Sequence, residues 1–158
     1  RYADCQFVVA AAPGVEAEFY ESVVGKTGVK IIYGATYPLL RVARAAVVNS
    51  GTATLETALF RVPQVVVYKV FGGRLIMLLK PLLIKTPWVS LVNIIAQREV
   101  VSELLAHNYT LERTDAELRD ILVDGDRRQQ ILHFYDEIIR TLGPSGAAER
   151  CVEKVAKF

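Results

Sequence analysis

The residues of this chain best suited to chemistry follow a short apolar run, at the point where a helical pattern begins. They are Ser50, Gly51, Thr52, Thr54 and Glu56. The start of a helix attracts anions, because its first backbone N–H groups are free and its dipole is positive there. Gly51 has no Cβ, so a phosphate can approach the backbone closely, and the neighbouring hydroxyls can donate hydrogen bonds to it. This turn therefore suits a diphosphate.

Glu56 adds a carboxylate to the same stretch. It follows Thr52 by four residues, so the two side chains are expected on one helix face. If Thr52 caps the helix, Glu56 lies beyond the N3 position of a capping box. A carboxylate there can accept two hydrogen bonds from a vicinal diol, such as that of a nucleotide ribose. An acid also suits a first helical turn electrostatically, so the spacing alone supports ribose binding and a structural role equally.

A second polar cluster occurs in the stretch Ser-Leu-Val-Asn-Ile-Ile-Ala-Gln-Arg-Glu. Ser90 and Asn93 are expected in a connecting segment, and an amphipathic helix is predicted over residues 97–108, with Arg98 and Glu99 in its first turn. The guanidinium of Arg98 could bind phosphate through two parallel hydrogen bonds. Residue types alone favour a solvated helix start, because loops and helix ends are generally polar.

The elements that must position these clusters alternate along the first half of the chain. Runs rich in Val and Ile are predicted to be strands, and helical patterns separate them. These runs are residues 6–12, 29–34, 45–49 and 63–70. Continuous apolar strands are typical of a parallel sheet with helices on both faces, and right-handed crossovers make the α/β fold Rossmann-like. We therefore predict one domain over residues 1–158, with a helical flank from about residue 110.

Composition restricts the class of protein. The chain has 158 residues, 52% of them hydrophobic, with a mean hydropathy of +0.27, so it can build a core and is not disordered. A net charge of +2 argues against a nucleic-acid partner. Cys5 and Cys151 lie far apart, which suits a reducing compartment. Neither a metal nor a cofactor is expected, and no dinucleotide fingerprint, P-loop, serine elbow or HExxH motif occurs.

The two clusters together resemble the lipid-A-disaccharide synthase family, most clearly between Ala46 and Leu105. Members of this family are GT-B glycosyltransferases with two Rossmann-like domains, and the match falls in the C-terminal domain, which binds the nucleotide sugar. The resemblance implies phosphate contacts for Ser50, Gly51, Thr52 and Thr54, a ribose contact for Glu56, and places in the donor cleft for Asn93, Arg98 and Glu99. The chain departs from the family pattern at Val92 and Gln97, where Pro and Gly are common.

The resemblance also implies a reaction. UDP-2,3-diacylglucosamine would transfer its sugar, with inversion, to 2,3-diacylglucosamine 1-phosphate, giving lipid A disaccharide and UDP. The general base and the acceptor pocket are expected in an N-terminal domain that precedes this chain, so the chain by itself is expected to be inactive. Two alternatives stay open: another UDP-sugar glycosyltransferase or epimerase, and a non-catalytic membrane-surface or interaction module.

An apolar segment, Leu75–Trp88, bears on where the protein acts. Its uninterrupted apolar run, Leu75–Leu79, is too short to span a bilayer, which takes roughly 20 residues. The segment could pack against the missing domain, or lie in the membrane interface with its Arg and Lys residues at anionic headgroups. We expect a cytoplasmic protein, with peripheral association at the inner membrane and a homodimer both left open.

Overall fold

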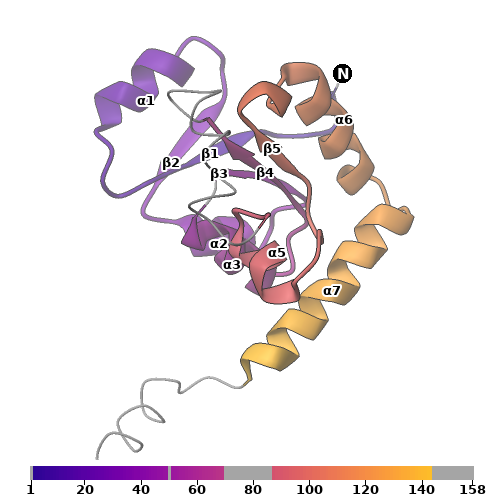
Figure 1. Ribbon diagram of the computed structural model, residues 1–158. Coiled ribbons are helices and arrows are strands. Elements are labelled where there is room, and N and C mark those ends of the chain that lie inside the picture. The colour runs from indigo at the N-terminus through magenta and orange to yellow at the C-terminus, as the bar shows by residue number, and fades with distance from the viewer. Residues whose placement is uncertain (1, 50, 70–86, 144–158) are drawn as a thin grey trace, which may run out of the picture. The chain divides into compact units, whose positions relative to one another are not determined.

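A computed structural model describes residues 2–49, 51–69 and 87–143, and it divides into two compact units, Arg1–Ala43 and Arg44–Phe158. In both units the strands are parallel and alternate with helices (Figure 1). This arrangement confirms the predicted α/β, Rossmann-like class.

The first unit holds one pair of parallel strands and the helices that follow them. Its elements are β1 (Val8–Ala11), α1 (Ala17–Val24), β2 (Lys30–Tyr33) and α2 (Thr36–Leu40). The register runs from the pair Val8–Lys30 to the pair Ala11–Tyr33. Tyr20 closes the end of β1, because its hydroxyl accepts a hydrogen bond from Ala12 N at 2.8 Å.

The second unit carries a three-stranded parallel sheet in the order β3-β4-β5. Its elements up to the end of the sheet are β3 (Ala46–Asn49), α3 (Thr52–Leu59), β4 (Gln64–Tyr68), α5 (Leu91–Ala96) and β5 (Glu103–Leu105). Strand β4 lies in the middle and is almost wholly apolar, as a strand covered on both faces must be. Because the strands are parallel, their carboxyl ends share one edge of the sheet.

The helical flank begins after a 3₁₀ turn at Ala106–Asn108 and consists of α6 (Leu111–Leu122) and α7 (Asp126–Leu142). The prediction of a helical flank is thus confirmed as far as Leu142. Figure 1 shows α3 and α5 on one side of the three-stranded sheet and α6 on the other. Helix α7 packs against α3, α5 and α6, so it joins the helical flank to the helices that cover one face of the sheet.

The predicted helix over residues 97–108 is wrong. Gln97 closes α5 in the left-handed conformation, with φ of 52°, and the chain then continues to β5. Val100 and Val101 are buried, and their amides donate to Asn93 Oδ1 at 2.8 and 3.0 Å. A side chain thus takes the place of the carbonyls that a helix would have offered these amides.

A three-residue cluster ties the turn between α6 and α7 to the residues that lead into β3. Arg128 is buried, and its Nη1 donates to the carbonyls of Arg44 and Ile121, both at 2.8 Å. Arg44 in turn pairs with Asp124 at 2.6 Å and donates to Leu122 O. Desolvation, followed by the charge of Arg44, lowers the pKa of Arg128, while Asp124 acts in the opposite direction.

Helix α7 is also held to the start of β4. Gln64 is buried, and its Nε2 donates to Tyr135 Oη at 3.1 Å and to the carbonyl of Thr54 at 2.9 Å. Tyr135 is fully buried, and this burial raises the pKa of its hydroxyl, while the hydrogen bonds from Gln64 act in the opposite direction. An ion pair between Arg61 and Asp136 supports the same contact from the surface.

Candidate functional site

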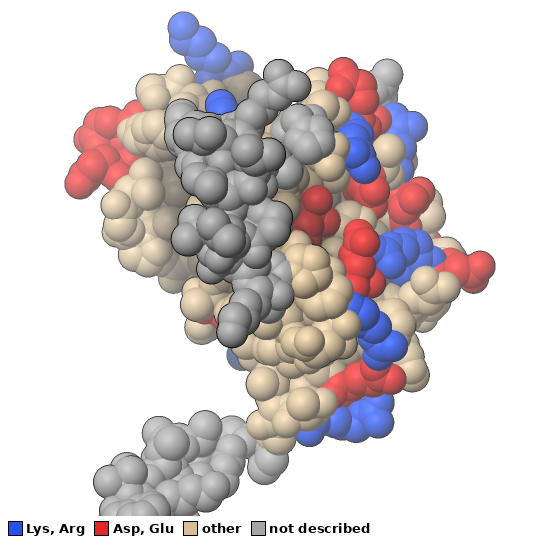
Figure 2. All heavy atoms as spheres, in the orientation of Figure 1, with Lys and Arg blue, Asp and Glu red and all other residues tan. Residues whose placement is uncertain are grey.

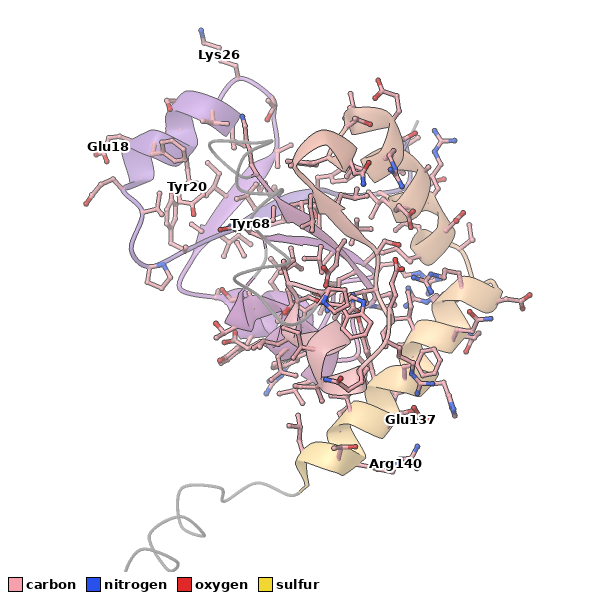
Figure 3. The ribbon with its side chains drawn as sticks, in the orientation of Figure 1. Glu18, Tyr20, Lys26, Tyr68, Glu137 and Arg140 are labelled. Atoms are coloured by element: carbon pink, nitrogen blue, oxygen red, sulfur yellow. The ribbon has the colours of Figure 1, made fainter. Side chains whose placement is uncertain are left out.

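The carboxyl edge of the three-stranded sheet carries the first predicted cluster. Strand β3 ends at Asn49, paired in register with Val67, and helix α3 begins three residues later at Thr52. Tyr68 ends the neighbouring strand β4 at this edge (Figure 3). Open parallel sheets bind ligands beyond the carboxyl ends of their strands. The topology therefore places the first cluster where an α/β protein binds its ligand.

Gly51 is the N-cap of α3, and Thr52 is its first helical residue. Gly51 has φ of 149°, a conformation that only glycine adopts without strain, and a Cβ added there would meet no atom of the described residues within 4 Å. Open space therefore lies next to the backbone at the point where a phosphate was expected. Ser50 lies outside the described residues, and its predicted phosphate contact stays a prediction.

Two backbone amides at the start of α3 are available to a ligand. The amide of Thr54 already donates to Gly51 O at 3.2 Å. Within the part of the chain that the structure describes, the amides of Thr52 and Ala53 meet no acceptor. Thr52 and Ala53 are also exposed. Together with the helix dipole, these amides give the turn the electropositive character that an anion needs.

The side chains of α3 divide between an inner and an outer face. Thr54, Thr57 and Ala58 are buried, with exposed fractions of 0%, 3% and 1%. Thr52 and Glu56, one turn apart, lie on the opposite side, and Glu56 is half-buried. No described residue forms a hydrogen bond or an ion pair with the Glu56 carboxylate. This carboxylate therefore keeps its acceptor capacity on the side of the helix that carries Thr52.

Thr54 has a different position from the one that its sequence context suggested. Its hydroxyl donates to Gly51 O at 2.8 Å and accepts a hydrogen bond from Leu91 N at 3.3 Å. Since the residue is completely buried, this hydroxyl serves the fold. The contact joins the first turns of α3 and α5, so the two polar clusters of the sequence form one structure.

Asn93 is likewise an internal residue, and it lies within α5, where a connecting segment was expected. Its Oδ1 accepts the amides of Val100 and Val101, and its Nδ2 donates to Val101 O and to Glu103 Oε1, both at 2.9 Å. The side chain is fully buried. Both donors and both acceptor positions of this side chain are thus used to fold the chain back from α5 to β5.

Glu103 joins the second cluster to the sheet, and the sequence analysis missed it. Its Oε1 accepts from Ser90 N at 2.9 Å, from Ser90 Oγ at 2.7 Å and from Asn93 Nδ2 at 2.9 Å. Its Oε2 accepts from Val89 N at 2.9 Å. The signal available in the sequence was an acid at the start of an apolar strand, where a buried charge needs several donors.

Arg98 lies just beyond the C-terminal end of α5, and no helix begins there. Its guanidinium stacks over the ring of Phe134, 4.1 Å from the centroid, and its Nη2 pairs with Glu137 Oε2 at 2.5 Å. Figure 3 shows Glu137 on α7. A hollow of about 170 Å³ surrounds this pair. Glu99 is exposed to solvent. The prediction that Arg98 and Glu99 lie in the first turn of a helix is therefore wrong.

The outer surface of the flank is polar. Figure 2 shows acidic and basic side chains interspersed over α6 and α7, with no patch of one sign on the face in view.

Residues 75–86 of the predicted apolar segment lie outside the described residues, and Trp88 at its end is half-buried. Among the helices of the described ranges, none is long and apolar enough to cross a membrane.

Known proteins match this chain over nearly all of its length. A sequence model described as lipid-A-disaccharide synthetase matches residues 4–154. Lipid-A-disaccharide synthase of Syntrophus aciditrophicus is 40% identical over 148 residues, covering 92% of this chain and 38% of the relative. The enzymes of the same name from Myxococcus xanthus and Pseudomonas putida are each 38% identical, over 97% and 86% of this chain. The chain spans about two fifths of the length of these curated relatives.

Proposed function

Because the chain belongs to the lipid-A-disaccharide synthetase family, we propose that it forms the donor-binding part of a glycosyltransferase. The proposed reaction transfers the sugar of UDP-2,3-diacylglucosamine to 2,3-diacylglucosamine 1-phosphate and yields lipid A disaccharide and UDP. The chain covers less than half of the length of these relatives, and we assign the acceptor pocket and the general base to the rest of the protein.

The first turn of α3 is the proposed site of the donor pyrophosphate. The observation that carries the proposal is that, among the described residues, no acceptor meets the amides of Thr52 and Ala53. These amides lie at the carboxyl edge of a parallel sheet, on a helix whose outer face also bears Glu56. Gly51 leaves room for phosphate oxygens, and the hydroxyls of Ser50 and Thr52 add donors. Glu56 would accept hydrogen bonds from the ribose hydroxyls, one turn further along α3.

The chemistry required of this site is the stabilisation of a leaving group. An acceptor hydroxyl attacks the anomeric carbon of the donor, the bond from that carbon to the pyrophosphate oxygen breaks, and UDP departs with the electron pair. The acceptor proton goes to the general base. Negative charge grows on the β-phosphate, and fixed backbone amides with a helix dipole stabilise it without reorganisation. We therefore assign the stabilisation of the departing UDP to the first turn of α3.

The remaining candidate residues support this site in different ways. We propose that Thr54 and Asn93 position the turns of α3 and α5, because both are buried and engaged in the fold. Arg98 would hold the end of α5 against α7. Glu99 is exposed, so it would contact the donor only if the rest of the protein holds the donor against this surface. The apolar segment Leu75–Trp88 would contact acyl chains, either against the N-terminal domain or at the inner-membrane surface. The protein would act in the cytoplasm, as a monomer or a homodimer.

Nucleotide titration of the full-length protein tests the proposal. Calorimetry should show UDP binding to the wild type and a loss of affinity of at least about tenfold in Glu56→Ala and in Thr52→Val, or about 1.4 kcal/mol. Glu112→Ala, which removes an exposed acid from the first turn of α6, is the matched control and should bind normally. Binding to anionic vesicles without any binding of UDP would instead support a membrane-surface module.

A further inference from the structure

We propose that Glu103 is a positioning residue, which acts through Leu91 and Thr54 to fix the direction of the Thr52 amide. This inference rests on the proposed function, because it names what aligns the phosphate-binding turn. The residue lies on β5, and its carboxylate never reaches the first turn of α3 itself. Its influence passes along a chain of hydrogen bonds between two helix starts.

The first step of this relay is the fixing of the start of α5. The Glu103 carboxylate accepts four hydrogen bonds, two from backbone amides at Val89 and Ser90 and two from the side chains of Ser90 and Asn93. Ser90 and Asn93 are fully buried. Such charge-assisted bonds are stronger than bonds between neutral groups, and four on one carboxylate leave Val89 and Ser90 little freedom.

The second step carries the constraint to α3. Leu91 follows Ser90 directly, and its amide donates to Thr54 Oγ1 at 3.3 Å. With one lone pair of its oxygen occupied in this way, the Thr54 hydroxyl directs its proton to Gly51 O at 2.8 Å. The amide of Thr54 donates to the same carbonyl at 3.2 Å. The Gly51 carbonyl is therefore held by two donors and points inward, along the helix.

The third step follows from the geometry of the peptide bond. In a trans peptide the carbonyl and the next N–H point in opposite directions. Since Gly51 O points into the helix, the Thr52 N–H points out of it, towards the space that a phosphate would occupy. Glycine would otherwise let this peptide rotate, because it tolerates nearly all backbone conformations. The relay from Glu103 selects the orientation in which the amide serves the ligand.

Two substitutions at Glu103 in the full-length protein separate positioning from bulk stability. Glu103→Ala removes all four bonds, and UDP affinity should fall about 10- to 50-fold, as expected for a lost charge-assisted network. Glu103→Gln keeps an oxygen for Ser90 and Asn93 but loses the negative charge and the Val89 contact, so its affinity should fall less than that of Glu103→Ala, by about three- to tenfold. Glu117→Ala is the control, because Glu117 accepts from Ser102 and joins the residue before β5 to α6. It should lower the melting temperature and leave UDP affinity unchanged.

A double-mutant cycle tests whether the effect passes through Thr54. Thr54→Val removes the hydroxyl and keeps the shape of the side chain. If both residues act along one relay, their effects should not add. The UDP affinity of the variant carrying both Thr54→Val and Glu103→Ala should then lie within about threefold of that of the weaker-binding single variant. Fully additive losses would overturn the inference, as would a Glu103→Ala variant with wild-type affinity.

Hydrogen–deuterium exchange without nucleotide keeps this inference separate from the proposed function. Exchange should accelerate in peptides containing Thr54 and Leu91 in Glu103→Ala, but not in Glu117→Ala. Acceleration confined to residues around Glu103 itself would refute the relay, even in a protein that binds UDP. Conversely, a wild-type protein that fails to bind UDP while showing the predicted exchange would refute the proposed function and retain the relay.

Discussion

Thr54 Oγ1 accepts a hydrogen bond from Leu91 N at 3.3 Å, and this contact joins the first turns of α3 and α5 across 37 residues of sequence. The two polar clusters of the sequence are therefore parts of one structure. One of them, at Gly51 and Thr52, faces open space, and the other, at Ser90 and Asn93, is buried and supports it. Substitutions in the first cluster should therefore weaken ligand binding, and substitutions in the second should lower stability.

Glu56 should discriminate the ribose of the nucleotide. Wild-type protein is expected to bind UDP at least about tenfold more tightly than its 2′,3′-dideoxy analogue, because a carboxylate accepting from two hydroxyls is left with unmet acceptors when both are absent. In Glu56→Ala the two nucleotides should bind equally and weakly. Competition titrations with both nucleotides measure this, and equal discrimination in the variant would remove Glu56 from the ribose site.

Gly51→Ala should impair both stability and binding. The cost arises from the backbone, because φ is 149° and a Cβ would meet no atom within 4 Å. We expect a loss of about 1–3 kcal/mol in the free energy of unfolding, together with weaker UDP binding, since the turn must shift. Gly14→Ala is the matched control, because its Cβ also meets nothing and its φ is negative or extended. Denaturant titrations should show no loss for that control.

Asn93→Ala should destabilise the fold strongly. It leaves the amides of Val100 and Val101 without an acceptor and removes a donor from Glu103. Each buried group left unsatisfied costs about 1–3 kcal/mol, so a total loss of about 3–5 kcal/mol is expected. Gln129→Ala, on the exposed side of α7, should be neutral in the same urea titration. A change in UDP affinity with unaltered stability would show instead that Asn93 touches the ligand.

Arg98→Ala should affect stability slightly and nucleotide binding not at all. The guanidinium is 52% exposed, so its ion pair with Glu137 is screened, and the stacking on Phe134 adds a similar small amount. We expect a loss of about 1 kcal/mol and a UDP dissociation constant within about twofold of the wild type. A tenfold weaker affinity would place Arg98 in the donor cleft, as the family resemblance implied.

Burial of Tyr135 should make the fold sensitive to high pH. The pKa of this hydroxyl is raised above its ordinary value of 10.0 by desolvation. The folded protein therefore keeps its proton while the unfolded chain loses it, so this contribution is complete below pH 10 and falls as pH rises above it. Urea titrations between pH 9 and 11.5 should show a steeper loss of stability for the wild type than for Tyr135→Phe.

The sequence was sufficient for the class of fold and for the location of the first cluster. Continuous Val- and Ile-rich runs predicted parallel strands, and β3 and β4 lie within the predicted ranges. The Gly-Thr turn after β3 and the helix that follows could be read locally, because caps and turns depend on neighbouring residues. The presence of Glu56 on the outer face followed from helical spacing alone.

The features that the sequence analysis missed depend on hydrogen-bond partners that lie far away in the chain. Thr54 and Asn93 look like ligand contacts in their local context, since nothing near them reveals that Leu91 or Val101 will occupy them. The helix predicted over residues 97–108 relied on the spacing of Val100, Val101 and Leu104, which also fits a buried strand and its approach. Short apolar runs do not distinguish these two structures by periodicity.

The cluster of Arg44, Asp124 and Arg128 restricts how this protein can vary in length. Arg128 binds carbonyls from two separate stretches, so the corner between α6 and α7 must keep its residue count for both bonds to form. Inserting or deleting one residue at the start of α7 would rotate Arg128 by about 100° about the helix axis and out of reach of these carbonyls. Tags, reporters and loop grafts therefore belong elsewhere in this chain.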